Sequence, residues 1–77
     1  MAIDLVTGAT GLLGGNLVRI LSLQGRYVRA LVREKANVTY LRSLPNVELI
    51  KGDITIPSSL TRPLQGVEHV YHCAALT

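Results

Sequence analysis

Three glycines at a spacing of three residues are the part of this sequence best suited to chemistry. Gly8, Gly11 and Gly14 follow a short, mostly apolar run over residues 3–6 and open a segment with helical periodicity. The N-terminus of a helix binds anions, because its first backbone N–H groups have no intrahelical partner and the helix dipole favours negative charge there. Glycine permits positive φ and lets a phosphate approach the backbone without meeting a Cβ atom. We therefore predict that this loop holds the phosphates of a dinucleotide.

These glycines have two other possible roles. The phosphate loop of an NTPase needs a Lys at a fixed offset after the glycines, and this sequence has none there. The glycines could also serve only a tight turn and close packing of helix against strand. Their spacing, G-x-x-G-x-x-G, differs from the common dinucleotide fingerprint G-x-G-x-x-G. The spacing therefore points to a narrower group of dinucleotide-binding proteins.

With Thr7 in front, residues 7–14 have the sequence Thr-Gly-Ala-Thr-Gly-Leu-Leu-Gly. This string resembles the cofactor loop of the short-chain dehydrogenase/reductase superfamily. It is most similar to the extended branch, which contains NAD(P)-dependent sugar epimerases and dehydratases and dihydroflavonol-4-reductase-like enzymes. The resemblance covers essentially the whole chain but only the first part of that family's domain. It implies an α/β protein with a Rossmann-type doubly wound parallel sheet, and it assigns cofactor binding to Gly8, Thr10, Gly11, Leu12, Leu13 and Gly14.

A basic residue follows the second predicted strand. Arg33 lies nineteen residues after Gly14. In the dinucleotide-binding fold an acidic residue near this place holds the ribose 2′-OH of NAD, whereas an Arg accommodates the 2′-phosphate of NADP. A guanidinium matches phosphate oxygens well, and Lys35 could add a second positive charge. We therefore expect the cofactor to be NADP. The alternative is NAD, because Glu34 could accept a hydrogen bond from a ribose hydroxyl. A third interpretation is that Arg33 is an ordinary solvated loop residue with no cofactor role.

Two later turns also match the resemblance. Residues 52–54, Gly-Asp-Ile, follow the third predicted strand. In the extended branch an Asp here accepts a hydrogen bond from the adenine amino group, which implies that role for Asp53 with the Ile54 backbone beside it; alternatively, Asp53 only caps a turn. After the fourth strand the string His-Cys-Ala-Ala resembles the H-x-A-A of the same branch. Its small residues, Ala74 and Ala75, are then expected to lie close to the cofactor ribose.

The two histidines and the single cysteine were considered as metal or catalytic groups. His69 and His72 are three residues apart on a predicted strand, so they point to opposite faces of the sheet. No carboxylate or second cysteine completes a metal site with them. We expect His72 to be structural, and Cys73 to be a small buried hydrophobic residue rather than a nucleophile.

Strand and helix patterns alternate along the chain. Strands are predicted over residues 2–7, 27–32, 47–51 and 68–73, and helices over residues 11–24 and 36–44. Pro57 suits the first position of a third helix, but Ile56 stands where similar sequences place an Asp cap, and Pro63 interrupts the segment. A short or broken helix ending near Gly66 is expected there. Right-handed crossovers then order the parallel sheet 3-2-1-4.

The first helix has a predicted inner and outer side. The apolar residues that recur at helical spacing, and are expected to face the sheet, are Leu13, Leu17, Ile20 and Leu21. Arg19 and Ser22 fall on the side expected to face water, and Gly25 is the predicted stop. In the weaker second helix Val38, Leu41 and Leu44 share one side.

The resemblance implies chemistry that these residues cannot complete. The extended branch uses a Tyr-x-x-x-Lys pair with a Ser or Thr, all located further along its chain; the Tyr passes the proton, and the Lys lowers the pKa of the Tyr and holds the nicotinamide ribose. Here the residues four places after the three tyrosines are Leu31, Leu44 and Ala75. No catalytic residue is therefore assigned, and we expect the chain to be the cofactor-binding start of an enzyme of roughly 300 residues.

That enzyme would transfer a hydride between NADP(H) and a carbonyl or alcohol carbon of a sugar nucleotide, a flavonoid-like compound or another small substrate. The alternatives are a non-catalytic NADP-binding regulatory or sensor module, and a structural or interaction peptide that kept the fold. A downstream Tyr-x-x-x-Lys pair separates the enzyme from the sensor, and cofactor binding separates both from the third possibility.

Composition and charge restrict the size of the domain and the kinds of partner it can bind. The 77 residues, 48% hydrophobic, suffice for one small domain. The net charge is +3, and the eight basic residues are spread along the chain without an aromatic platform among them, which argues against nucleic-acid binding. No signal peptide or membrane span is expected. A single cysteine suits a reducing cytoplasm, and an oligomer is compatible with all of these features.

Overall fold

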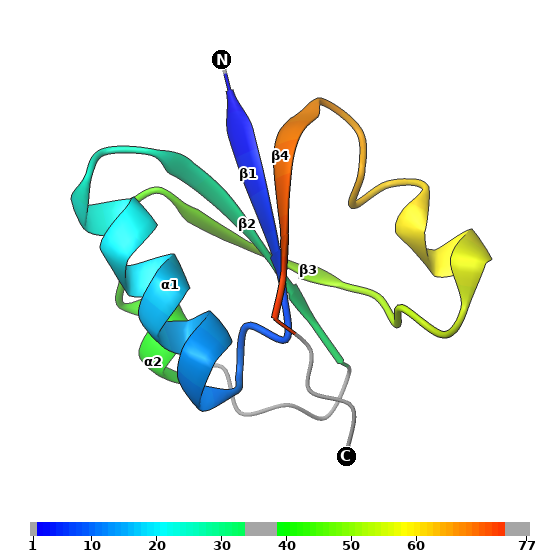
Figure 1. Ribbon diagram of the computed structural model, residues 1–77, viewed down its shortest axis with the longest axis horizontal. Helices are drawn as coiled ribbons and strands as arrows, with labels where there is room; N and C mark the ends of the chain where they lie inside the picture. The colour runs from blue at the N-terminus through cyan, green and yellow to red at the C-terminus, as the bar shows by residue number, and fades with distance from the viewer. Residues whose placement is uncertain (1, 34–38, 74–77) are drawn as a thin grey trace.

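The computed structural model describes residues 2–33 and 39–73 of the chain. Strands and helices alternate along it (Figure 1). In chain order the elements are β1 (Ile3–Thr7), α1 (Leu12–Leu23), β2 (Tyr27–Val32), α2 (Thr39–Arg42), β3 (Val47–Lys51), the 3-10 helix η1 (Pro57–Leu60) and β4 (Val67–His72). The predicted strands are thereby confirmed, with β1 beginning one residue later and β4 beginning and ending one residue earlier than expected. Of the predicted second helix, residues 39–42 are helical and residues 36–38 lie outside the described residues.

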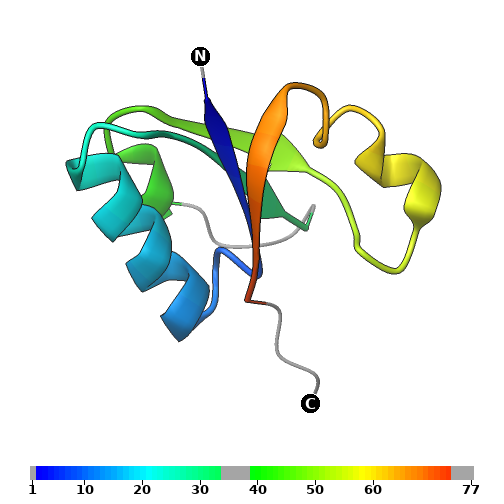
Figure 2. The same cartoon turned by 45° about the horizontal axis from the view of Figure 1, so that its top comes forward.

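The four strands form one parallel sheet in the order β3-β2-β1-β4, as the sequence predicts. The helices α1 and α2 cover one face of the sheet, and the crossover that carries η1 lies on the other face (Figures 1 and 2). All four strands therefore end at the same edge, where the turn from β1 into α1 also lies. None of the described helices has the length and apolar character needed to span a membrane.

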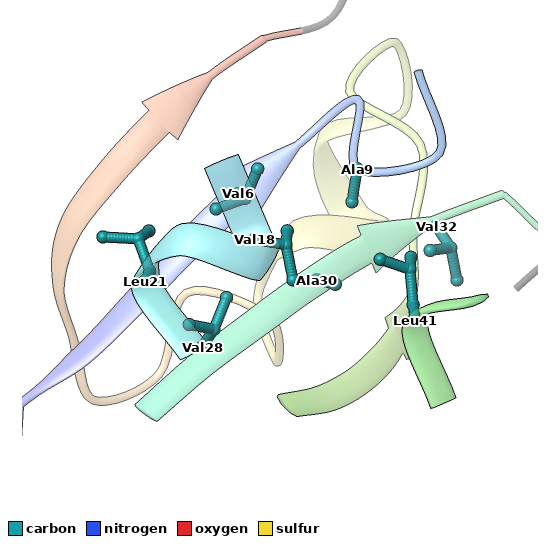
Figure 3. Packing of buried hydrophobic residues seen from close by; sticks show 8 residues of the cluster. All are labelled: Val6, Ala9, Val18, Leu21, Val28, Ala30, Val32 and Leu41. Atoms are coloured by element: carbon teal, nitrogen blue, oxygen red, sulfur yellow. The ribbon is translucent and has the colours of Figure 1, made fainter. Parts of the chain in front are cut away.

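The main core lies between α1, α2 and the sheet (Figure 3). Its buried residues are Val6, Ala9, Val18, Leu21, Val28, Ala30, Val32 and Leu41. Alternate residues of β1 and β2 enter this core, as expected for strands whose neighbouring side chains point to opposite faces. The helix α2 ends two residues before Leu44, earlier than predicted, but Leu44 still packs against the core to which Leu41 belongs; Val38 lies outside the described residues.

The side of α1 that faces the sheet differs from the prediction. Leu13 and Ile20 are 69% and 45% exposed, whereas Ser22 is buried at 2%. The buried residues of the helix are Gly14, Gly15, Val18, Leu21 and Ser22. The two glycines must face the turn that precedes the helix, because only they permit such a close approach. This requirement rotates the helix and leaves Leu17 half-buried at the margin of the core.

Hydrogen bonds at the C-terminal end of α1 agree with this orientation. The hydroxyl of Ser22 donates to the carbonyl of Pro45, which joins the helix to the start of β3. At the C-terminus Gly25 has a φ of 81°, its N–H donates to Ser22, and the N–H of Arg26 donates to Leu21. These two bonds form the glycine C-cap of the Schellman type, which confirms the predicted stop.

The crossover from β3 to β4 is short and held by side chains. Pro57 occupies the first position of η1, as predicted, and turns continue from there to Gly66. Arg29 of β2 donates to the carbonyl oxygens of Pro63 and Gln65 at 2.8 and 2.6 Å. The same guanidinium pairs with Glu48 of β3 at 2.9 Å. One partly buried arginine therefore fastens the end of the crossover to the sheet.

An ionic cluster lies at the amino ends of the strands, opposite to the glycine turn. Asp4 of β1 is fully buried, and it accepts hydrogen bonds from Nε and Nη2 of Arg26. Nδ1 of His69 on β4 lies 3.1 Å from the same carboxylate. The hydrogen bond from Arg26 is the main reason that the pKa of Asp4 lies below its ordinary value. A buried carboxylate in the central strand is thus tied to the strands on both sides.

We predict that Asp4→Asn lowers the thermal unfolding midpoint of the intact protein and weakens the dependence of that midpoint on acid. Because the folded-state pKa of Asp4 is lowered, its contribution to stability is present above about pH 4 and is lost as the pH falls through the folded-state pKa. Thermal unfolding of both proteins between pH 7 and pH 3 measures this effect. Glu68→Gln, at an exposed carboxylate on β4 that acts on Arg26 only through its charge, is the comparison and should change the acid response less than Asp4→Asn does. Equal acid responses of Asp4→Asn and wild type would contradict the prediction.

Candidate cofactor site

The glycine turn brings the backbone of α1 against the end of β1. Gly8 has a φ of 66°, which favours glycine, and its carbonyl accepts from the N–H of Gly11 at 3.0 Å. A Cβ atom on Gly14 would lie 2.1 Å from the carbonyl oxygen of Gly8, and one on Gly11 would lie 3.3 Å from the same atom. The three predicted glycines thus meet around one carbonyl, and Gly14 has room for a hydrogen atom only.

The N-terminus of α1 is capped by backbone alone. Gly11 is the N-cap and contributes no side-chain hydrogen bond, and no acidic residue occurs in the first turn. The first bond across the turn runs from the N–H of Gly15 to the carbonyl of Gly11 at 2.8 Å. The N–H groups of residues 12–14 precede that bond, so the helix itself offers them no acceptor. These donors and the helix dipole make the turn suitable for an anionic group.

A cleft of about 900 Å³ lies at the carboxyl ends of the strands, beside this turn. Its size is in the range of sites for small molecules and cofactors. It is lined by Gly8, Thr10, Gly11, Leu12, Leu13, Leu31, Val32, Arg33, Gly52, Asp53, Ile54, His72 and Cys73. A smaller hollow of about 270 Å³ lies at the amino ends, and its only carboxylate, that of Glu48, is already paired with Arg29. The larger cleft is therefore the candidate site.

Most of the predicted site residues come together in this cleft. Those of the glycine turn except Gly14 line one side, and Arg33, Asp53 and Ile54 line the part beyond β2 and β3. Gly14 is buried behind the turn, where it sets the approach of the helix. Lys35, Ala74 and Ala75, which were also predicted to bind cofactor, lie outside the described residues.

Asp53 has the properties of a turn-capping residue. Its Oδ1 accepts from the backbone N–H of Thr55 at 2.9 Å and from the Thr55 hydroxyl at 2.7 Å. The hydroxyl bond, followed by the backbone bond and the nearby positive charge of Arg33, lowers the pKa of Asp53. The carboxylate therefore stays ionised and available as an acceptor at the wall of the cleft. The sequence left open a capping role or a cofactor role, and the position of Asp53 is compatible with both.

The two histidines have separate partners on opposite faces of the sheet, as expected from their spacing. Nδ1 of His72 lies 2.7 Å from the hydroxyl of Thr7, which joins the carboxyl ends of β4 and β1 beside the cleft. His69 lies against Asp4 at the other end of the sheet. No cluster of three metal-ligating side chains occurs within residues 2–33 and 39–73. Cys73 is half-buried, packs against the core and also lines the cleft.

Sequence reasoning missed the polar partners of these residues. The sequence places Thr7 at the front of the glycine motif and Asp4 within the first strand, but it indicates neither the contact of Thr7 with His72 nor that of Asp4 with His69. The hydroxyl of Ser59 accepts from the backbone N–H of Asp53 at 2.9 Å. The parallel register could have paired Asp4 with His69, because both precede the carboxyl ends of neighbouring strands by similar distances.

Comparison with known proteins identifies the family. The model of the NmrA-like family matches residues 3–76 of the chain. This chain belongs to the NmrA-like family. The predicted extended short-chain dehydrogenase/reductase type is confirmed by the same match together with the relatives and structures that follow.

The NmrA-like chain is similar to two bacterial proteins over most of its length. It is 49% identical over 71 residues to sterol demethylase protein B of Methylococcus capsulatus, covering 92% of this chain and 21% of that protein. It is 42% identical over 71 residues to ceramide reductase of Caulobacter vibrioides, covering 92% of this chain and 22% of that protein. The chain thus spans about a fifth of the length of these curated relatives.

Solved structures share the fold of this NmrA-like chain. The crystal structure of gox2253 superposes with a TM-score of 0.88 and 38% identity, over 100% of this chain and 23% of that one. Vestitone reductase from alfalfa (Medicago sativa) superposes with a TM-score of 0.85 and 26% identity, over 97% of this chain and 26% of that one. AtPrR2, solved with NADP+ and (+)pinoresinol, superposes with a TM-score of 0.82 and 25% identity, over 96% of this chain and 26% of that one. The Rossmann-type sheet predicted from the sequence is therefore confirmed.

We predict that Gly14→Ala destabilises the intact protein, although Ala is the better helix former. The added Cβ would lie 2.1 Å from the Gly8 carbonyl oxygen, so the helix or the turn must move. Overpacking of this kind costs roughly 1–3 kcal/mol of the free energy of unfolding, which urea unfolding measures. Asn16→Ala, on the exposed side of the same helix, is the control and should be neutral or stabilising. A gain in stability for Gly14→Ala would show that the turn is looser than described.

Proposed function

We propose that this chain is the NADP-binding part of an NAD(P)-dependent oxidoreductase or epimerase of the extended short-chain dehydrogenase/reductase type. The observation that carries the proposal is the glycine turn. The approach of Gly14 to Gly8 leaves no room for a Cβ atom, and the open N-terminus of α1 faces a cleft of cofactor size. A pyrophosphate fits such a turn because it can approach the backbone N–H groups closely.

The other side chains of the cleft suit the adenosine half of the cofactor. Arg33, at the end of β2, provides a guanidinium for the 2′-phosphate, and Asp53, after β3, provides an acceptor for the adenine amino group. Ile54 and Leu31 add apolar surface beside them. These residues bind and orient the cofactor, whereas the nicotinamide of a bound cofactor would supply the hydride chemistry.

The proposed reaction is hydride transfer between NADP(H) and a carbonyl or alcohol carbon of a small substrate. Support comes from relatives that are named as reductases, among them ceramide reductase and vestitone reductase. Their names cover sphingolipid and flavonoid chemistry, so the substrate proposed here stays at the level of a carbonyl or alcohol compound. No catalytic residue is assigned to this chain, and a cytoplasmic location is proposed from its single cysteine.

We predict that Gly11→Asp abolishes binding of both NADP and NAD. The new carboxylate would lie at the N-cap of α1, against the negative charge of the pyrophosphate, and would take the place of the anion at the helix terminus. Calorimetric titration of the intact protein with each dinucleotide measures the loss, and the thermal midpoint verifies folding. Asn16→Asp adds the same charge on the exposed side of α1 and should bind as the wild type does. Unchanged affinity of Gly11→Asp would remove the central claim.

We predict that Arg33→Ala weakens NADP binding by about ten- to a hundredfold and changes NAD binding little. Charge-assisted hydrogen bonds to the 2′-phosphate are lost, and NAD has no group there. Dissociation constants for the two dinucleotides give the comparison. Arg19→Ala, at an exposed arginine of α1 away from the cleft, is the matched control. Equal losses for NADP and NAD would mean that Arg33 does not bind the 2′-phosphate.

A further inference from the structure

The loop that carries Asp53 is held by two hydroxyl groups from the residues that follow it. The hydroxyl of Ser59 accepts from the N–H of Asp53 at 2.9 Å and lies 2.9 Å from the Asp53 carbonyl oxygen and 2.7 Å from that of Ile56. The Thr55 hydroxyl and N–H both donate to Oδ1 of Asp53. Ser59 therefore fixes the backbone of Asp53, and Thr55 fixes its carboxylate.

The crossover begins without a side-chain helix cap, so the bonds of Thr55 and Ser59 are the side-chain hydrogen bonds that hold the loop before η1. Ile56 is the N-cap of η1, and its side chain makes no capping hydrogen bond. At Gly52 a Cβ atom would lie 2.6 Å from Leu31 Cδ1 and 3.2 Å from the carbonyl oxygen of Ser59, so the loop packs closely on the sheet. Ser59 thus contacts the backbone on both sides of Asp53, and the bonds from Thr55 set the direction of its carboxylate.

The orientation matters because a carboxylate can only accept hydrogen bonds when ionised. Both donors from Thr55 contact Oδ1, and among residues 2–33 and 39–73 no hydrogen bond is made to Oδ2. Asp53 lines the cleft with Arg33 and Ile54, so its second oxygen is the one left for a ligand. A ligand group that meets this oxygen must be a donor.

We propose that Thr55 and Ser59 are positioning residues that make this cleft selective for a 6-amino purine over a 6-oxo purine. The inference rests on the proposed function, since it concerns the base of the same dinucleotide. Adenine presents an amino donor at C6, whereas hypoxanthine presents a carbonyl acceptor there that repels the carboxylate. A side chain held in one orientation maintains this distinction. A side chain that is free to rotate loses it, because it also accepts from N1–H of hypoxanthine or from water.

The test compares binding of NADP and of its deamino analogue, nicotinamide hypoxanthine dinucleotide phosphate, to the intact protein. The variants are Thr55→Val, which keeps the shape and removes the hydroxyl, and Ser59→Ala. Ser58→Ala is the matched control, because Ser58 is an exposed neighbour on η1. Thr55→Ser, which keeps the hydroxyl, is the conservative variant. Thermal midpoints are measured for every variant.

The wild type is expected to prefer NADP over the deamino analogue by about tenfold or more, which is the equivalent of one well-oriented hydrogen bond. Thr55→Val and Ser59→Ala are each expected to lower the ratio several-fold, mainly by weakening NADP, because the backbone N–H of Thr55 still donates to Asp53 in both variants. Ser58→Ala and Thr55→Ser are expected to keep it. A merely structural role would lower the thermal midpoint or both affinities together without changing the ratio.

Three results would overturn the proposal. A wild-type ratio near one means that the cleft does not distinguish the two bases. An unchanged ratio in both Thr55→Val and Ser59→Ala, with folding intact, means that the hydroxyls do not orient Asp53. Failure of the wild type to bind either dinucleotide contradicts the proposed function itself, and this outcome is distinct from the first two.

Discussion

The contact of Gly14 with the carbonyl of Gly8 determines how α1 sits on the sheet. A hydrogen atom is the only side chain that fits there, so the helix is pressed against the end of β1 with its two glycines inward. The buried face of the helix, the exposure of Leu13 and Ile20, and the direction of the N-terminus all follow from this contact. The packing and the anion-binding geometry therefore have one cause, which explains why the core and the cleft adjoin at the same turn.

Local signals in the sequence sufficed for the parts of the fold that depend on the backbone. The strands, the stop at Gly25 and the sheet order follow from periodicity, turn residues and the handedness of crossovers. The orientation of α1 did not follow from periodicity, because counting apolar residues gave Leu13 and Ile20 more weight than the glycines. Steric exclusion at one atom outweighed the burial of two large side chains, and periodicity contains no information about such a contact.

Side-chain hydrogen bonds were the other part that could not be predicted. The resemblance assigned part of the cleft lining, and Arg33, Asp53 and Ile54 lie there as expected, but it did not assign Leu31, Val32, Gly52, His72 or Cys73 to the cofactor site. The partners of Asp53 are local in the chain, yet no rule distinguishes Ser59 from Ser58 before the bend of the loop is known. Asp4 and Arg26 meet only because two strands pair in register, a relation that depends on the whole sheet.

The polar residues of β1 lie at its two ends and on opposite faces of the sheet. Asp4 is tied to Arg26 and His69 near the beginning of the strand, and Thr7 contacts His72 at its end, roughly 10 Å further along. One end adjoins the cleft and the other does not. Substitutions at the carboxyl edge can therefore change ligand preference while the ionic cluster at the amino edge holds the strands together. If such a substitution lowers the stability of the fold, a second substitution at the amino edge can restore it without contacting the ligand. Because the two ends are separated in space, residues that affect ligand binding and residues that affect stability can change independently within one short strand.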